Sequence, residues 1–392
     1  MSAAMLSFVP GPVDPALLVA PSYSAPLLID AAAITANGSN IFEGNWENTS
    51  YSDNAGAAIQ VTTTQPVIIR NSRFKAQKYC ITSLVNGSDI TVENCIGLVR
   101  CVNEAGRSAQ RFLNVGQPKN LVCEHNTIVG GGILLDSTAT GGTLLVRVRY
   151  NRMLNTDGRK SDGAGGYVFE RANNVNGGYW ESIQFIQHRN IVVNDGEVAW
   201  NEVVEAPFVC RSEDNFTFYS GSGISSKRIA VHDNCTRGGH STRPYDLGYS
   251  GAGCLAEGTS AYIDFDDNHI IGHGNIALHI SGGNYISARR NRYVSCGRIR
   301  GRLWYALNAG ASYAGNGTST NIVFEDNGYS WVGPGGSQVS ISMPISGSNG
   351  NSHTGSYSIA SPTTEATEAA EWALWRAKVA AAGVRIGSTL AV

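Results

Sequence analysis

The chain has 392 residues and a formal net charge of −2, and charged residues make up only 15% of it, against about 25% in typical globular domains. This low, balanced charge offers no basic surface of the kind that binds nucleic acid, so we expect no nucleic-acid partner. No apolar run reaches the length needed to cross a bilayer, so we expect no membrane span.

Residues 1–40 are expected to form a lead-in that caps the N-terminal end of the structure. The first residues, MSAAMLSFVPGPVDP, lack the basic segment and the sustained apolar core of a signal peptide. We therefore expect a protein that is secreted after removal of a leader, lies at a cell surface, or belongs to a virion.

Residues 41–360 repeat one template, in which apolar and polar residues alternate and an Asn follows. The stretches YIDFDDN and YISARRN end at Asn268 and Asn291, which are 291 − 268 = 23 residues apart. Further copies end at Asn71, Asn94, Asn126, Asn151, Asn190, Asn234 and Asn327, with a weaker one at Asn45. A repeat of this period indicates one supersecondary unit that stacks on its neighbours.

The alternation within the template is that of a half-buried strand, with Ile263 and Phe265 facing the core and Asp264 and Asp266 facing out. The Asn then lies at a turn, where its side chain can bond local backbone groups. A period near 23 residues fits three short strands and three turns, whereas a β-propeller blade needs about 40–50 residues. We therefore predict an all-β fold, a right-handed parallel β-helix whose Asn residues form a ladder.

Residues 361–392 form an Ala-rich tail that predicts a short C-terminal α-helix. Ser361 and Pro362 are suited to its start and Gly383 to its end. Trp372 and Trp375 give this helix apolar surface. We prefer a cap or strut on the β-helix to an oligomer contact, because the ends and edges of stacked coils need cover.

Eight Cys residues are present, without a CxxC pair, so we expect no zinc site. We interpret them as small buried side chains rather than disulfides. His269, His273 and His279 do not recur at ligand spacing on one strand, so we expect no metal triad.

The region most suggestive of chemistry runs from 194 to 241. It contains NDG at 194–196, SEDNFTFYSGSG at 212–223 and NCTRGGHS at 234–241, and RIR follows at 298–300. In this order the motifs resemble those of the pectin-lyase-like right-handed β-helix superfamily, and locally the polygalacturonase type of glycoside hydrolase. The first motif lacks the family's Thr, and the third ends in Ser241 where the family has Gly.

The resemblance implies a catalytic cluster of Asp195, Glu213 and Asp214, supported by His240. It also implies that Arg298 and Arg300 hold a carboxylate of the substrate. Glycoside hydrolysis needs one carboxylic acid to protonate the leaving oxygen and one carboxylate to activate water. Crowded acids raise one another's pKa, which produces such a proton donor.

Several further side chains are candidates for substrate binding. Asp264 and Asp266 could extend a subsite or bind calcium, but we prefer to interpret them as a solvated face. Tyr219 and Trp200 could stack on sugar rings, or serve as partly buried packing.

These observations favour an enzyme that hydrolyses a polysaccharide in a surface groove without a cofactor. Three alternatives stay open: a polysaccharide lyase, which would need calcium; a non-catalytic glycan-binding or adhesive protein; and a phage tail-spike domain. The partner is a polysaccharide in each case. We expect a monomer, or a homotrimer if the protein is a tail spike.

Overall fold

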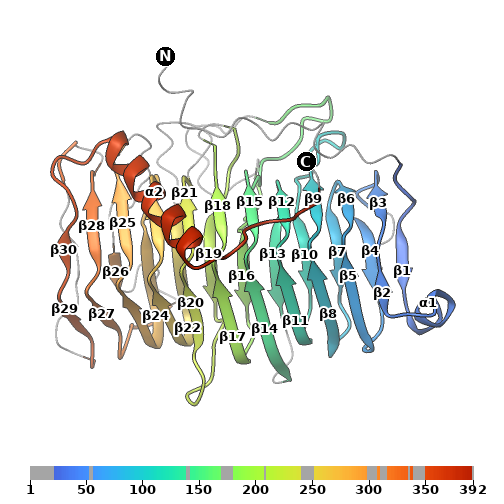
Figure 1. Cartoon of the computed structure of the whole chain (residues 1–392), viewed down its shortest axis with the longest axis horizontal. Helices are drawn as coiled ribbons and strands as arrows, with labels where there is room; N and C mark the ends of the chain where they lie inside the picture. Colours follow the sequence, from blue (N-terminus) through green and yellow to red (C-terminus); the bar gives the residue numbers. More distant parts are fainter. Residues whose placement is uncertain are drawn as a thin grey trace.

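The computed structural model describes residues 22–52, 56–137, 142–168, 180–206, 209–239, 251–297, 307–309, 316–333, 336–338 and 349–390. Apart from two helices, these residues form short strands that wind into a parallel β-helix (Figure 1). The predicted all-β fold is confirmed.

The coils stack into three parallel sheets, and almost every coil contributes one described strand to each of them. Sheet 1 contains β1 (Leu27–Ile29), β4 (Ala57–Val61), β7 (Tyr79–Ser83), β10 (Arg111–Val115), β13 (Gly132–Asp136), β16 (Ile186–Arg189), β19 (Asp214–Tyr219), the first half of β22 (Ala252–Asp266), the first half of β24 (Leu278–Arg289), and β26 (Leu307–Ala309). Sheet 2 contains β2 (Ile41–Phe42), β5 (Pro66–Arg70), β8 (Ser88–Glu93), β11 (Pro118–Glu124), β14 (Thr143–Arg149), β17 (Val193–Ala199), β20 (Ile229–His232), the second halves of β22 and β24, β27 (Val323–Glu325) and β29 (Ser352–Thr354).

Sheet 3 follows a sharp corner. It contains β3 (Asn45–Asn48), β6 (Arg73–Ala76), β9 (Ile96–Val99), β12 (Thr127–Val129), β15 (Arg152–Leu154), β18 (Glu202–Val204), β21 (Cys235–Arg237), β23 (His269–Ile271), β25 (Arg292–Ser295), β28 (Gly328–Trp331) and β30 (Tyr357–Ser358). In β22 and β24 the strand continues from sheet 1 into sheet 2. Ile263 pairs with Ile286 and Phe265 with Ala288 in parallel register, so the 23-residue offset of the sequence is one coil.

The interior of the coil is one continuous hydrophobic core. It runs from Ile29 in β1 to Trp331 in β28, and the alternating residues of all three sheets supply it. Stacking is what stabilises these strands, because a strand of three to seven residues buries too little surface alone. All eight Cys residues are free and seven are buried, which confirms their interpretation as packing side chains.

A ladder of buried Asn side chains lies at the corner between sheets 2 and 3. Within the described residues its members are Asn126, Asn151, Asn201, Asn234, Asn268, Asn291 and Asn327. Each member before Asn327 donates from both its backbone N and its Nδ2 to Oδ1 of the next, at 2.9–3.1 Å. The predicted Asn ladder is therefore present.

The ladder differs from the prediction in its membership. The left-handed backbone conformation belongs to the residue before each ladder Asn, such as Asp267 with φ +57°. Asn71 and Asn94 occupy this preceding position, with φ +49° and +51°, so Ser72 and Cys95 stand where the ladder Asn would be. Asn190 lies at the corner between sheets 1 and 2 instead, and Asn201, which the template search missed, takes its place in the ladder.

The two helices lie outside the coil. Helix α1 (Ala31–Asn37) is at the N-terminal end, and β1 precedes it, so the sheets begin inside the expected lead-in. Helix α2 (Glu365–Ala381) begins after Thr364, which forms a capping box with Thr367, rather than at Ser361. None of the helices in the described residues is long and apolar enough to cross a membrane.

Helix α2 lies along sheet 3 as a strut (Figure 1). Trp375 is buried against Cys235 and Ile271, and its Nε1 donates to the carbonyl oxygen of Asp233 at 2.8 Å. The buried Glu371 carboxylate accepts from Arg292 Nε at 2.6 Å and lies 2.6 Å from His269 Nδ1. These contacts hold the helix on the side of the coil rather than over its end.

Candidate functional site

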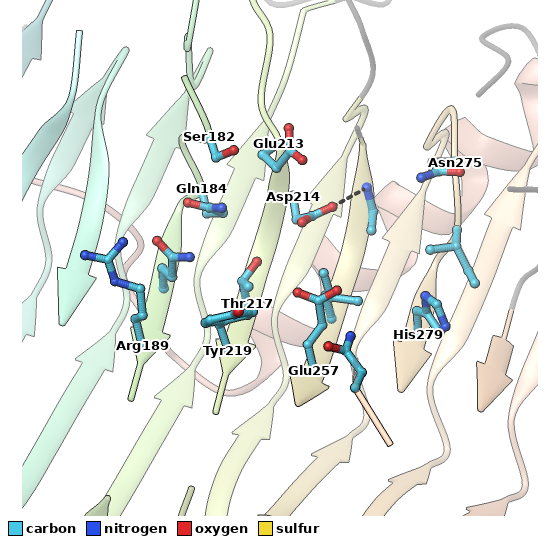
Figure 2. Close-up of a pocket in the computed structure, with 15 residues that line it drawn as sticks. Ser182, Gln184, Arg189, Glu213, Asp214, Thr217, Tyr219, Glu257, Asn275 and His279 are labelled. Atoms are coloured by element: carbon cyan, nitrogen blue, oxygen red, sulfur yellow. Dashed lines mark hydrogen bonds between the residues drawn. The ribbon is translucent and has the colours of Figure 1, made fainter. Parts of the chain in front are cut away.

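An open pocket of about 420 Å³ lies on the outer face of sheet 1, over β16, β19, β22 and β24. Figure 2 shows side chains from these neighbouring coils converging on it. Its lining is mostly polar and consists of Ser182, Gln184, Gln187, Arg189, Glu213, Asp214, Thr217, Tyr219, Ala252, Leu255, Glu257, Asn275, Ile276, His279 and Asn316.

Strand alternation places the β19 side chains Thr217 and Tyr219 on the outside. Phe216 and Phe218 enter the core, so Thr217 and Tyr219 between and after them face the pocket. Parallel register then aligns one outward residue per coil: Arg189 beside Tyr219, and Tyr219 beside Glu257. Neighbouring strands lie about 4.8 Å apart, so side chains in such a row can interact directly.

Three carboxyl groups, those of Glu213, Asp214 and Glu257, line this pocket. Burial raises the pKa of Asp214 well above its usual value, and the nearby charges of Glu213 and Glu257 raise it further. Burial and the charge of Glu213 raise the pKa of Glu257 to about 7. Asp214 Oδ1 accepts a hydrogen bond from the backbone N of Ala252 at 3.1 Å (Figure 2).

Two arginines beside the pocket, Arg189 and Arg211, are paired with carboxylates. Arg189 forms an ion pair with Asp136, which precedes it in the same row. Arg211 is buried, stacks on Trp180 with 3.4 Å to the ring centroid, and lies 3.4 Å from Glu213 Oε2. Glu213 is thus the carboxyl group of the three that has an arginine as its ion-pair partner.

Asp195 does not join Glu213 and Asp214, contrary to the prediction. It lies on β17 in sheet 2, where it pairs with Arg147 at 2.7 Å and with Lys227 at 2.6 Å. The interval of 213 − 195 = 18 residues is less than a full turn, because the chain passes only through sheet 3 before it enters sheet 1. Burial opposes ionisation there, but the hydrogen bonds from Lys227 and Arg147 leave the pKa of Asp195 lowered.

Most of the predicted substrate-binding residues also lie away from the pocket. Asp264 and Asp266 face outward from the sheet 2 half of β22, and Asp264 pairs with Arg228 at 2.8 Å. Trp200 lies at the Asn-ladder corner, with Lys378 5.7 Å from its ring centroid. Tyr219 lines the pocket. His240, Arg298 and Arg300 lie outside the described residues.

Glu257, Arg189 and His279 line the pocket but are not among the residues predicted to form the site. Glu257 lies on a strand in which buried and outward residues alternate, because Cys254 and Ala256 are buried on either side of Leu255. The sequence shows this alternation. The position of Glu257 opposite Tyr219 depends on a coil with an insertion, so the sequence spacing alone does not reveal it. Within the described ranges, His, Cys, Asp and Glu form no group able to hold a metal ion.

Comparisons with protein-family models, with curated proteins and with solved structures found no match for this chain.

Proposed function

We propose that the protein is a carbohydrate-active enzyme that hydrolyses a polysaccharide in the pocket on sheet 1. The observation that carries this proposal is the pair Asp214 and Glu257, two carboxyl groups with raised pKa in one open pocket beside Glu213. A carboxylic acid that keeps its proton near neutral pH, next to a second carboxyl group, is the requirement of glycoside hydrolysis.

Glu257 is the residue we assign as proton donor to the leaving oxygen. Its pKa of about 7 leaves it half protonated at neutral pH, and its side chain is only partly buried, so a substrate can reach it. Glu213, which has Arg211 as its cationic neighbour, is assigned to the activation of water. The charges of Glu213 and Glu257 both raise the pKa of Asp214, so Asp214 interacts electrostatically with each of the two assigned residues.

The shape of the site suits a polymer. The pocket is open and lies on a sheet that continues on both sides of it, so a chain can extend beyond the bound unit. Tyr219 is 43% exposed at the pocket, and an aromatic ring in such a position can stack on a sugar face.

The test is release of reducing ends from a panel of polysaccharides, measured as a function of pH. We expect the rate to fall above about pH 7, because Glu257 loses the proton that it must donate. In Glu257→Gln this fall of the rate above about pH 7 should disappear, together with most of the activity. If a polysaccharide binds but none is cleaved, the protein is a glycan-binding protein and the catalytic proposal fails.

A further inference from the structure

Arg111 holds two of the side chains that line the pocket, Gln184 and Gln187, by hydrogen bonds. It begins β10 and is 96% buried, with a relative exposure of 4%. Its guanidinium donates to the backbone oxygens of Ser182 and Gln184 at 2.9 and 3.1 Å, and to the side-chain oxygens of Gln184 and Gln187 at 2.9 and 3.2 Å. The neighbouring residue in register is Gly132, where a side chain would collide with the Gln184 carbonyl oxygen.

These bonds fix the direction of two amide groups. A guanidinium only donates, so the atoms of Gln184 and Gln187 that face Arg111 must be their oxygens. Their NH₂ groups therefore point away from Arg111. Gln184 is almost fully buried and lines the pocket, and its Nε2 has no acceptor among the described residues. Figure 2 shows Gln184 and Asp214 on neighbouring coils at the pocket.

The pocket therefore has a donor wall and a carboxyl wall. The donor wall consists of the amide groups of Gln184 and Gln187, and the carboxyl wall of Glu213, Asp214 and Glu257. Three arginines of the described ranges lie nearby and are already engaged: Arg111 by four oxygens, and Arg189 and Arg211 by carboxylates. In the part of the chain that the structure describes, neither Asp214 nor Glu257 has an ion-pair partner.

We infer that this pocket binds an uncharged sugar unit and disfavours a uronate or sulfated one. Sugar hydroxyl and ring oxygens accept from the two amide groups, while sugar hydroxyls donate to the carboxyl groups. The described residues beside the pocket include no uncommitted arginine, so an anionic unit would lie against the carboxyl wall without one of them to neutralise it. The inference rests on the proposed glycan-processing site, and it narrows the class of substrate.

The experiment compares ligands that differ only in charge. Galacturonan and alginate oligosaccharides are prepared with native carboxylates, and in a second batch with those carboxylates reduced to primary alcohols. Binding is measured by calorimetry, and hydrolysis is read from the same samples. We expect the reduced oligosaccharides to bind about tenfold more tightly or better, the effect of one like-charge contact worth one pKa unit.

Two variants and a pH series test whether the pocket is responsible. Gln184→Glu removes an amide donor and should weaken binding of the reduced ligands about fivefold, the scale of one hydrogen bond. Gln60→Glu makes the same change on β4 of the same sheet, four coils away, and should leave binding unchanged. The discrimination against carboxylates should be larger at about pH 8.5 than at about pH 5.5, because Glu257 ionises between them.

The outcomes separate this inference from the proposed function. Tighter binding of the reduced ligands without cleavage supports the inference and contradicts hydrolysis. Equal or tighter binding of the native carboxylates overturns the inference, whether or not they are cleaved. Absence of binding by every oligosaccharide overturns both.

Discussion

Sheets 1 and 2 are built from the same alternating strands, but two acids on each sheet are in opposite electrostatic states. On sheet 2, Asp195 and Glu197 lie among Arg147, Arg149 and His232, and the pKa of each acid is lowered. On sheet 1, Asp214 and Glu257 lie in a pocket where the described residues offer them no such partner, and the pKa of each is raised. An outward acid on a β-helix is therefore not informative until its neighbours on adjacent coils are known.

The same comparison distinguishes acids that contribute to the stability of the fold from acids that are suited to catalysis. Paired acids on sheet 2 resemble ordinary surface ion pairs, which contribute little each. Acids that are crowded and buried on sheet 1 destabilise the charged form of the site, and such sites persist where function requires them. Exchange of single carboxyl groups on the two sheets tests this contrast directly.

The largest effect is expected on activity. Glu257→Gln should lower turnover of an active polysaccharide by about 10² or more, because it removes a positioned proton donor. Asp195→Asn, the matched change on sheet 2, should retain turnover within about twofold, since Asp195 is held by Arg147 and Lys227 away from the pocket. Equal losses in the two variants would show that the contrast between the sheets does not locate the chemistry.

A change in the Asn ladder should lower the stability of the whole coil, and so of both compared sheets. Asn268 accepts from the backbone N and Nδ2 of Asn234 and donates to Asn291 and to the Val231 carbonyl. Asn268→Leu leaves several of these buried groups unpaired, so we expect a loss of about 2–3 kcal/mol in the free energy of unfolding.

Chemical denaturation measures this loss, with Asn194→Leu as the control. Asn194 is an exposed residue on β17, where the same substitution removes no ladder bond. If both variants lose the same stability, the ladder contributes nothing beyond its surroundings.

Asp214→Asn should stabilise the protein at about pH 8. Asp214 has a raised pKa in the folded state, so the folded state holds a proton that the unfolded state has released. Stability therefore falls as pH rises from the unfolded pKa of about 3.9 to the higher folded value. The amide keeps an oxygen for the Ala252 backbone N and carries no charge, so we expect a gain of about 1 kcal/mol.

Urea titrations at about pH 5 and pH 8 measure this gain, with Asp195→Asn beside it. The gain of Asp214→Asn should be larger at the higher pH. Asp195→Asn should instead lose up to about 1 kcal/mol, the value of exposed ion pairs. A loss of stability in Asp214→Asn at pH 8 would mean that this carboxyl group is a structural element.

The sequence predicts local structure well because the repeat is local. The period of 23 residues, the alternation of Ile263 and Phe265, and the ladder Asn268 and Asn291 are all found within one coil. It also identifies Glu213 and Asp214, which are neighbours at the start of β19, together with Tyr219.

The rest of the site depends on how many residues each coil contains. The family resemblance groups Asp195 with Asp214, but the 18 residues from Asp195 to Glu213 are less than one coil, whereas the turn between Asn151 and Asn201 takes 50 residues. Insertions of this kind change the sheet in which a residue lies, although the alternation of apolar and polar residues around it stays the same. Glu257 and the Arg111 contacts to Gln184 and Gln187 arise from stacking across coils, which no short motif encodes.

The smallest expected effect concerns the pH dependence of sheet 2. His232 Nδ1 lies 2.7 Å from Asp233 Oδ2, and Nε2 lies 3.2 Å from Glu197 Oε1. Burial opposes its protonation, but these hydrogen bonds raise the pKa of His232 to about 9. A raised folded pKa contributes stability that is fully present below the unfolded pKa of about 6.5 and is lost as pH rises through about 9.

His232→Gln should therefore be less stable than the wild-type protein at about pH 6 and nearly equal to it above about pH 9.5. The difference should stay below about 1 kcal/mol, because the imidazole is partly exposed and water screens its ion pairs. Urea midpoints at the two pH values measure it. A difference that is the same at both would assign the role of His232 to packing, and sheet 2 would then owe less of its stability to charge than its ion pairs indicate.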